Sequence, residues 1–128
     1  MPVVLPHHSV VGVFNPDNEF NLTGIITDVE WINPHTYIHL DVYSETEDEA
    51  NRLTKWQLES APTAFLTKAG VTRTMLLGDG KPVTITGIAA RNEDLKSGWI
   101  YRITYDDGHF YQLSAARAAI ASGGDSDE

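Results

Sequence analysis

Alternation of apolar and polar positions is the clearest pattern in the chain. Residues 22–32 alternate so that one face carries Thr23, Ile25, Thr27, Val29 and Trp31 and the other carries Gly24, Ile26, Asp28 and Glu30. A period of two is typical of a half-buried strand. The following Asn33-Pro34 predicts a turn, because proline fixes φ and lacks an N–H donor.

The same pattern predicts five further strands, over residues 35–43, 53–60, 82–91, 99–105 and 109–113. Gly78-Asp79-Gly80 and Asp106-Asp107-Gly108 have the composition of turns. The faces that we assign to the interior carry Ile25, Val29, Ile38, Leu40, Trp56, Leu58, Val83 and Ile85.

The pattern changes to helical spacing between residues 60 and 70. Ser60 suits an N-cap, Pro62 suits the first turn, and Gly70 suits the C-terminal cap. This predicts one helix of two to three turns. An alanine-rich stretch, 114–121, predicts a second short helix near the end of the chain.

Three strands, a helix and then two or three strands is the element order of an OB-type barrel. We therefore predict a mainly β fold: a five- to six-stranded OB-type barrel with one short helix between strands 3 and 4. An open β-sandwich is the alternative. Residues 1–21 read as an extended N-terminal arm, 22–121 as the OB-like domain, and 122–128 as a flexible acidic tail.

The length of 128 residues fits a single domain. The chain has no cysteine, which excludes disulfides and cysteine-ligated metals. No apolar run approaches the ~20 residues that cross a bilayer, so we expect no membrane insertion. The first residues lack the basic region and the apolar region of a signal peptide.

The net charge of −9 comes mostly from two short stretches. They hold seven of the 18 acidic residues: Glu45, Glu47, Asp48, Glu49, Asp125, Asp127 and Glu128. The rest of the chain is nearly neutral, and its nine Lys and Arg residues are scattered. Nucleic acid binding requires a clustered basic face, so we expect no nucleic acid partner.

Histidines are the first candidates for chemistry. His7 and His8 lie on the predicted arm, and His35 and His39 share one face of a strand. Four residues of a strand span about 13 Å, so His35 and His39 cannot bind one ion together. An arm folded back over the strand would bring its imidazoles to His35, and we predict a zinc or copper site of His7, His8 and His35 on that basis. Surface histidines without a ligand are the alternative.

A polar strand face is the second candidate. It carries Glu30, His35, Tyr37, His39, Asp41, Gln57 and Glu59. Carboxylates beside imidazoles support acid–base chemistry when burial shifts their pKa values, although such a face is usually only solvated. We select Tyr37, His39 and Glu59 as candidate ligand-binding residues. The sequence has no serine-hydrolase elbow, P-loop or dinucleotide fingerprint.

Four motifs carry a resemblance to a known family. They are Pro6-His7-His8-Ser9, LTGIITDVEWINPH, KWQLES and AGVTRTMLLGDGKPVTITG. In this order they resemble the small exported bacterial proteins of the DUF6152 type, over roughly residues 6–115. Val10, where that family often has Phe, and the position of Glu59 depart from its pattern. The resemblance implies an OB-like fold and a periplasmic or secreted location, but no reaction.

The leading functional hypothesis is a non-enzymatic binding or accessory domain of the periplasm. It would hold a metal ion or a small ligand, or dock a partner protein. The alternative is a small enzyme that uses histidines and carboxylates on a small molecule, with or without a metal. Oligonucleotide binding rests on fold analogy alone. A cytoplasmic location and a homo-oligomer stay open.

Overall fold

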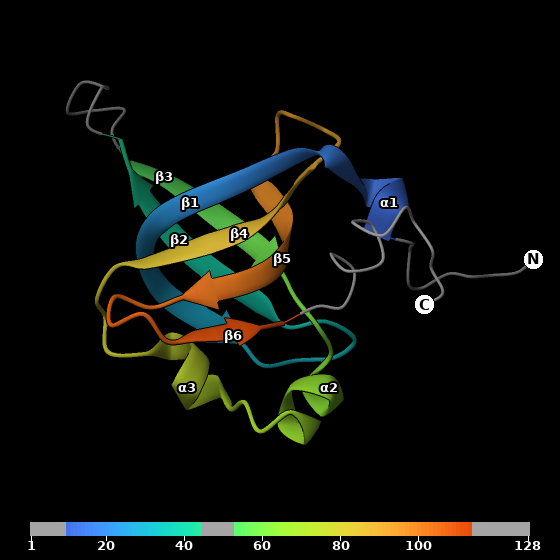
Figure 1. The fold of residues 1–128 in the computed structure, drawn as a ribbon. Coiled ribbons are helices and arrows are strands. Elements are labelled where there is room, and N and C mark those ends of the chain that lie inside the picture. The colour runs from blue at the N-terminus through green and yellow to red at the C-terminus, as the bar shows by residue number, and fades with distance from the viewer. Residues whose placement is uncertain (1–9, 45–52, 114–128) are drawn as a thin grey trace, which may run out of the picture.

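The computed structural model describes residues 10–44 and 53–113 (Figure 1). Within them the elements follow in this order: α1 (Val10–Val13), β1 (Phe14–Glu30), β2 (Tyr37–Tyr43), β3 (Leu53–Glu59), α2 (Thr63–Lys68), α3 (Arg73–Leu77), β4 (Val83–Ala90), β5 (Ser97–Thr104) and β6 (Phe110–Gln112). The fold is mainly β, as predicted. None of the helices in this part of the chain is long and apolar enough to cross a membrane.

The six strands form one sheet in the order β3-β2-β1-β4-β5-β6. The neighbours in this order pair antiparallel. One additional pairing, parallel, joins β3 to β5, so that β1 to β5 form a ring. The long β1 runs along both β2 and β4, and α2 and α3 lie together at one end of the ring (Figure 1).

The interior of the ring is apolar and contains most of the predicted core. The buried residues that the sequence placed there are Val29, Ile38, Leu40, Leu58, Val83 and Ile85. The same core also contains Ile100 and Ile103 from β5, Leu66 from α2 and Leu76 from α3. Full burial of each large aliphatic side chain stabilises the fold by roughly 1.5–3 kcal/mol.

A β-bulge explains why the face prediction for Ile25 was wrong. The pairing of β1 with β2 shifts register between Ile26 and Asp28, so Thr27 is an extra residue. Before the bulge the even-numbered residues face the core, and Ile26 is buried while Ile25 is only half-buried. An extra residue reverses the alternation of side chains, which places Val29 inside after the bulge.

Trp56 lies at the border of the core rather than inside it. Its side chain is partly buried and packs against the core cluster. Its ring centroid is 5.9 Å from that of Phe20. The predicted core face of β3 is therefore correct, but the fully buried residue on it is Leu58.

The predicted helix over residues 60–70 is present as α2, with a different start. Pro62 is its N-cap residue, without a side-chain cap. Ser60 instead continues the strand pairing, and its N–H donates to the Thr36 carbonyl at 2.8 Å. At the C-terminus the prediction for Gly70 is confirmed: its φ is 84°, and the Val71 N–H donates to the Leu66 carbonyl at 2.8 Å. This is a Schellman motif.

A second helix before β4, α3, was not predicted. The Thr72 side chain caps its first turn by accepting a hydrogen bond from the Met75 N–H at 3.1 Å. Arg73 anchors it to the bulged part of β1, donating to the Val29 carbonyl at 2.8 Å and contacting Asp28 at 2.9 Å. The cap residue was readable in the sequence, but the anchor depends on the fold.

The prediction of an extended arm over residues 1–21 was wrong for 10–21, because Val10–Val13 form the helix α1 and β1 begins at Phe14. Phe14 pairs with Ala90, and the pairing resumes at Glu19 after an irregular stretch that contains Pro16. Proline interrupts a strand pattern in the sequence and is tolerated at such irregularities. The rest of the arm (1–9), the predicted helix at 114–121 and the tail at 122–128 lie outside the described residues.

The burial of Leu58 gives a direct test of the ring. We expect Leu58→Ala to lower the free energy of unfolding by about 2–5 kcal/mol, because it leaves a cavity in the core. Gln57→Ala, one residue away on the exposed face, should change it by about 0.5 kcal/mol or less. Urea unfolding of the two variants measures both values. Equal losses would contradict the assigned faces of β3.

Candidate ligand-binding site

One face of β2 and β3 is polar because the opposite face is the core. The two strands pair Tyr37 with Glu59, His39 with Gln57, and Asp41 with Lys55. Ile38, Leu40 and Leu58 occupy the alternate positions and are buried. Successive side chains of a strand point to opposite sides, so the paired polar residues share the outer surface of the ring.

His35 and Glu59 form the most enclosed polar contact of this face. The Nδ1 atom of His35 lies 2.5 Å from Oε2 of Glu59, and the two side chains are only 14% and 10% exposed. The His35 ring also meets Trp99 edge-on, with centroids 5.5 Å apart. The ladder continues beyond Tyr37 through the Thr36 N–H and the Ala61 carbonyl, which holds His35 beside Glu59.

Tyr37 lies in the field of two carboxylates. Burial raises the pKa of Tyr37, and the charges of Glu59 and Glu30 raise it further. The phenol therefore stays neutral and keeps its hydrogen for donation. Glu30 also contacts Nε2 of His39, whose side chain is one-third exposed. The structure thus brings together His35 with Glu59, and His39 with Glu30, as two separate pairs.

A groove opens next to His39. It has a volume of about 470 Å³ and is lined by His39, Lys55, Trp56, Gln57, Leu95, Lys96 and Ser97. We call it the β3–β5 groove, because it is lined by Gln57 of β3 and Ser97 of β5, which pair in parallel. The Gln57 N–H donates to the Lys96 carbonyl at 3.0 Å, and the Lys96 ammonium lies 5.6 Å from the centre of the Trp56 ring. Its size is that of a site for a small molecule.

Of the predicted ligand-binding residues, His39 lines this groove. Tyr37 and Glu59 lie farther along the same face. Glu59 is paired with Trp99 of β5. Lys96 and Ser97 were not predicted as site residues. No local signal marks them, because their place in the groove depends on the pairing of β5 with β3.

The predicted metal site falls partly outside the described residues. His7 and His8 belong to the stretch 1–9, so the approach of either to His35 stays a prediction. Within residues 10–44 and 53–113 there is no group of three His, Asp or Glu side chains that would hold a metal ion.

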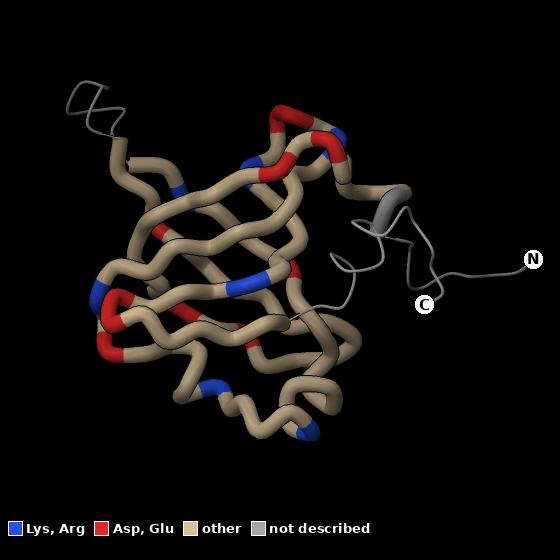
Figure 2. The backbone as a smooth tube through the Cα atoms, in the orientation of Figure 1, with Lys and Arg blue, Asp and Glu red and all other residues tan. Residues whose placement is uncertain are grey.

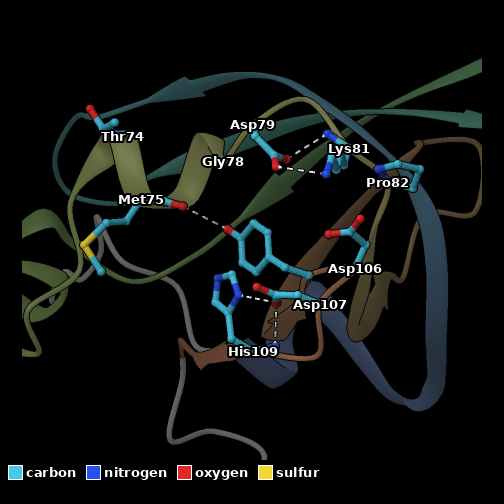
Figure 3. A pocket seen from close by; sticks show the side chains of 10 residues that line it. Thr74, Met75, Gly78, Asp79, Lys81, Pro82, Asp106, Asp107 and His109 are labelled. Atoms are coloured by element: carbon cyan, nitrogen blue, oxygen red, sulfur yellow. Dashed lines mark hydrogen bonds and ion pairs between the residues drawn. The ribbon is translucent and has the colours of Figure 1, made fainter.

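A second cavity lies between α3 and the turn from β5 to β6 (Figure 3). Its volume is about 250 Å³, and Asp79, Lys81, Asp107 and His109 are among its lining residues. Nδ1 of His109 lies 2.5 Å from Asp107, and hydrogen bonds from the backbone and ring of His109 lower the pKa of that carboxyl. Lys81 lies 3.9 Å from Asp79.

Tyr105, which lines this second cavity, connects two parts of the fold. Tyr105 stacks on His109, with centroids 4.5 Å apart, and its hydroxyl donates to the Leu76 carbonyl at 2.6 Å. Burial is the main reason that the pKa of Tyr105 is raised. Tyr105 thus ties the β5–β6 hairpin to the end of α3. This cavity is smaller than the β3–β5 groove, and four of its charged groups pair with one another as Lys81–Asp79 and His109–Asp107, which makes it a weaker candidate.

Basic residues are spread thinly over the described backbone, as Figure 2 shows for Lys and Arg. Lys55 and Lys96 nevertheless meet in the β3–β5 groove, although they lie 41 positions apart in the sequence. The lining of the groove therefore contains two ammonium groups, of which that of Lys55 also contacts Asp41.

The chain belongs to the family of unknown function DUF6152, whose model matches residues 3–99. This confirms the resemblance seen in the motifs. No curated protein and no solved structure matches the chain.

The two carboxylates near Tyr37 provide a test of this geometry. In Glu59→Gln the pKa of Tyr37 should fall toward its ordinary value, and only partly, because burial is the largest cause of the shift. NMR titration of ring-labelled tyrosine measures it. Glu93→Gln, in the exposed turn before β5, is the control and should leave Tyr37 unchanged. An unaltered Tyr37 pKa in Glu59→Gln would refute the contact.

The same shift fixes the sign of a pH effect. A raised pKa in the folded state means that the folded protein holds the phenolic proton more tightly than the unfolded chain. The resulting stability is fully present below about pH 10, the ordinary tyrosine pKa, and is lost as the pH rises through the folded-state value.

Proposed function

We propose that this chain is a small-ligand-binding domain whose ligand occupies the β3–β5 groove. The observation that carries the proposal is the groove itself, where His39, Lys55 and Gln57 from two strands meet Lys96 and Ser97. These side chains place several hydrogen-bonding groups beside Trp56 and Leu95, and such groups fix the orientation of a small molecule in its site.

The proposed architecture is an OB-type barrel. The ring of five strands and the helical segment between β3 and β4 support it. In OB folds the face of strands 2 and 3, together with the loop between strands 4 and 5, binds ligands. The β3–β5 groove has this composition, because Leu95 and Lys96 belong to the connection from β4 to β5.

Binding is favoured over catalysis by what lines the groove. General acid–base chemistry is carried out by positioned side chains, most often histidines or carboxyl groups, that reach the substrate. Here the lining includes one imidazole and no carboxylate. The better enclosed pair, His35 with Glu59, lies beside Trp99 and is mostly buried. A periplasmic or secreted location remains part of the proposal, supported by the resemblance of the motifs alone.

Filling the groove tests the proposal. In an NMR screen of small fragments against the full chain, we expect hits to shift the amides of Gln57, Lys96 and Ser97. Gln57→Trp places a large ring in the groove and should abolish these hits. Gln112→Trp, at an exposed position of β6, is the matched control and should keep them. Hits that survive Gln57→Trp unchanged, or that map to other residues, would refute this site.

A zinc or copper site is the second candidate function. It is favoured by the contact between Nδ1 of His35 and the Glu59 carboxylate, because metal-binding imidazoles are commonly oriented in this way by a carboxylate. The further ligands that we propose are His7 and His8, which lie outside the described residues.

Calorimetric titration with zinc or copper tests this second candidate. We expect one site in the unchanged chain, lost in His35→Ala and in the double variant His7→Ala/His8→Ala. His109→Ala removes an imidazole from the second cavity and should leave the site intact. If the unchanged chain binds neither ion stoichiometrically, the metal candidate fails and the groove proposal stands alone.

A further inference from the structure

The charged side chains that line the β3–β5 groove are all basic, although the whole chain is acidic. The net charge of the chain is −9, yet the groove is lined by two lysines and one histidine and by no aspartate or glutamate. The remaining lining residues are neutral: Trp56, Gln57, Leu95 and Ser97. A ligand in this groove therefore meets positive charge and neutral hydrogen-bonding groups.

The ammonium groups of Lys55 and Lys96 make different contacts. Lys55 is 74% exposed and contacts Asp41 at 3.2 Å, outside the lining of the groove. An ammonium has three donors, so this contact leaves Lys55 able to donate to a second acceptor. Lys96 lies over the Trp56 ring, and its backbone is fixed by the hydrogen bond from Gln57.

The rest of the groove is suited to a flat apolar body. Trp56 is partly buried, so part of its side chain remains accessible beside the Lys96 ammonium, and Leu95 is 53% exposed. A ligand that covers exposed apolar side chains removes them from water, which lowers the free energy of the complex. Aromatic rings also stack on one another with a preferred offset geometry.

We infer that the ligand of the β3–β5 groove is a small organic anion, a carboxylate or sulfonate attached to a flat apolar body. The inference rests on the proposed function and names its ligand class. The anionic group lies between Lys55 and Lys96 and accepts hydrogen bonds from Gln57 or Ser97. The apolar body lies against Trp56 and Leu95. An organic cation would face two ammonium groups, and a neutral analogue would form no charge-assisted ion pair with them.

Three probes that share one body and differ in charge test this assignment. They are naphthoate, naphthylmethanol and naphthylmethylamine, which are negative, neutral and positive near neutral pH. Titrations of the full chain are followed by NMR at the Trp56 indole N–H and at the Gln57 and Ser97 amides. We expect naphthoate to bind about tenfold more tightly than the alcohol, from one charge-assisted hydrogen bond. The amine should bind most weakly.

Lysine variants show whether the preference for a negatively charged ligand comes from the lysines of the groove. Lys96→Met and Lys55→Met keep an apolar stem but remove the ammonium. Each should weaken naphthoate binding by roughly three- to tenfold and leave the alcohol unchanged, since these are partly exposed contacts. Lys81→Met removes a lysine from the second cavity and should have no effect. Added salt should weaken naphthoate only.

The outcomes separate the ligand class from the proposed function. If the alcohol or the amine binds in the groove as tightly as naphthoate, the groove is a ligand site but the assignment to anions is overturned. If none of the three probes shifts the groove residues, both proposals are overturned. If a short single-stranded oligonucleotide displaces naphthoate at low micromolar concentration, the assignment to a small molecule is overturned.

Discussion

The parallel pairing of β3 with β5 is the constraint on which the rest of the structure depends. It joins β3, one edge strand of the sheet, to β5, the strand next to the other edge, and so closes β1 to β5 into a ring. Gly98, which pairs with Leu58 in this contact, is also packed closely against β1 and β4. A Cβ at this position would lie 2.5 Å from the Phe20 ring and 2.8 Å from the Ile88 carbonyl oxygen, so no larger residue fits without displacement.

The same pairing builds both parts of the polar face. It sets Gln57 against Ser97, which forms the groove, and Glu59 against Trp99, which encloses the His35 contact. Trp99 belongs to a second apolar cluster, with Phe14, Ile88, Ala90 and Tyr101. One end of the face is therefore an open groove that contains two lysines. The other end holds an enclosed imidazole–carboxylate pair beside apolar side chains.

The sequence predicted those features that depend on local periodicity. Ile38, Leu40 and Leu58 lie on strands without irregularities, so alternation assigned their faces correctly. It failed for Ile25 because a bulge reverses the alternation at Thr27, and no residue type marks a bulge reliably. The start of β1 was missed because Pro16 breaks the pattern of a strand that tolerates it at an irregular position.

The candidate site was predicted in part for the same reason. Tyr37, His39 and Glu59 share a face by simple alternation, so their selection needed only the strand assignment. Their partners could not be read locally: the Glu30 contact of His39 is diagonal across a bulged pair of strands. Lys96 and Ser97 join the groove through a parallel pairing, and such non-local contacts carry no signature in a single sequence.

A positive groove on a strongly acidic chain is physically consistent, because charges act locally in salt solution. At physiological ionic strength the Debye length is about 8 Å, so charges farther away than this contribute little to the potential in an open groove. Lys55 and Lys96 lie in the wall of the groove, whereas Asp41 and Glu30 each contact a wall residue from outside the lining. Those two carboxylates limit the potential without occupying the space in which a ligand would bind. The ligand is thus selected by the groups it can touch, and the net charge of −9 affects mainly how fast an anion approaches from a distance.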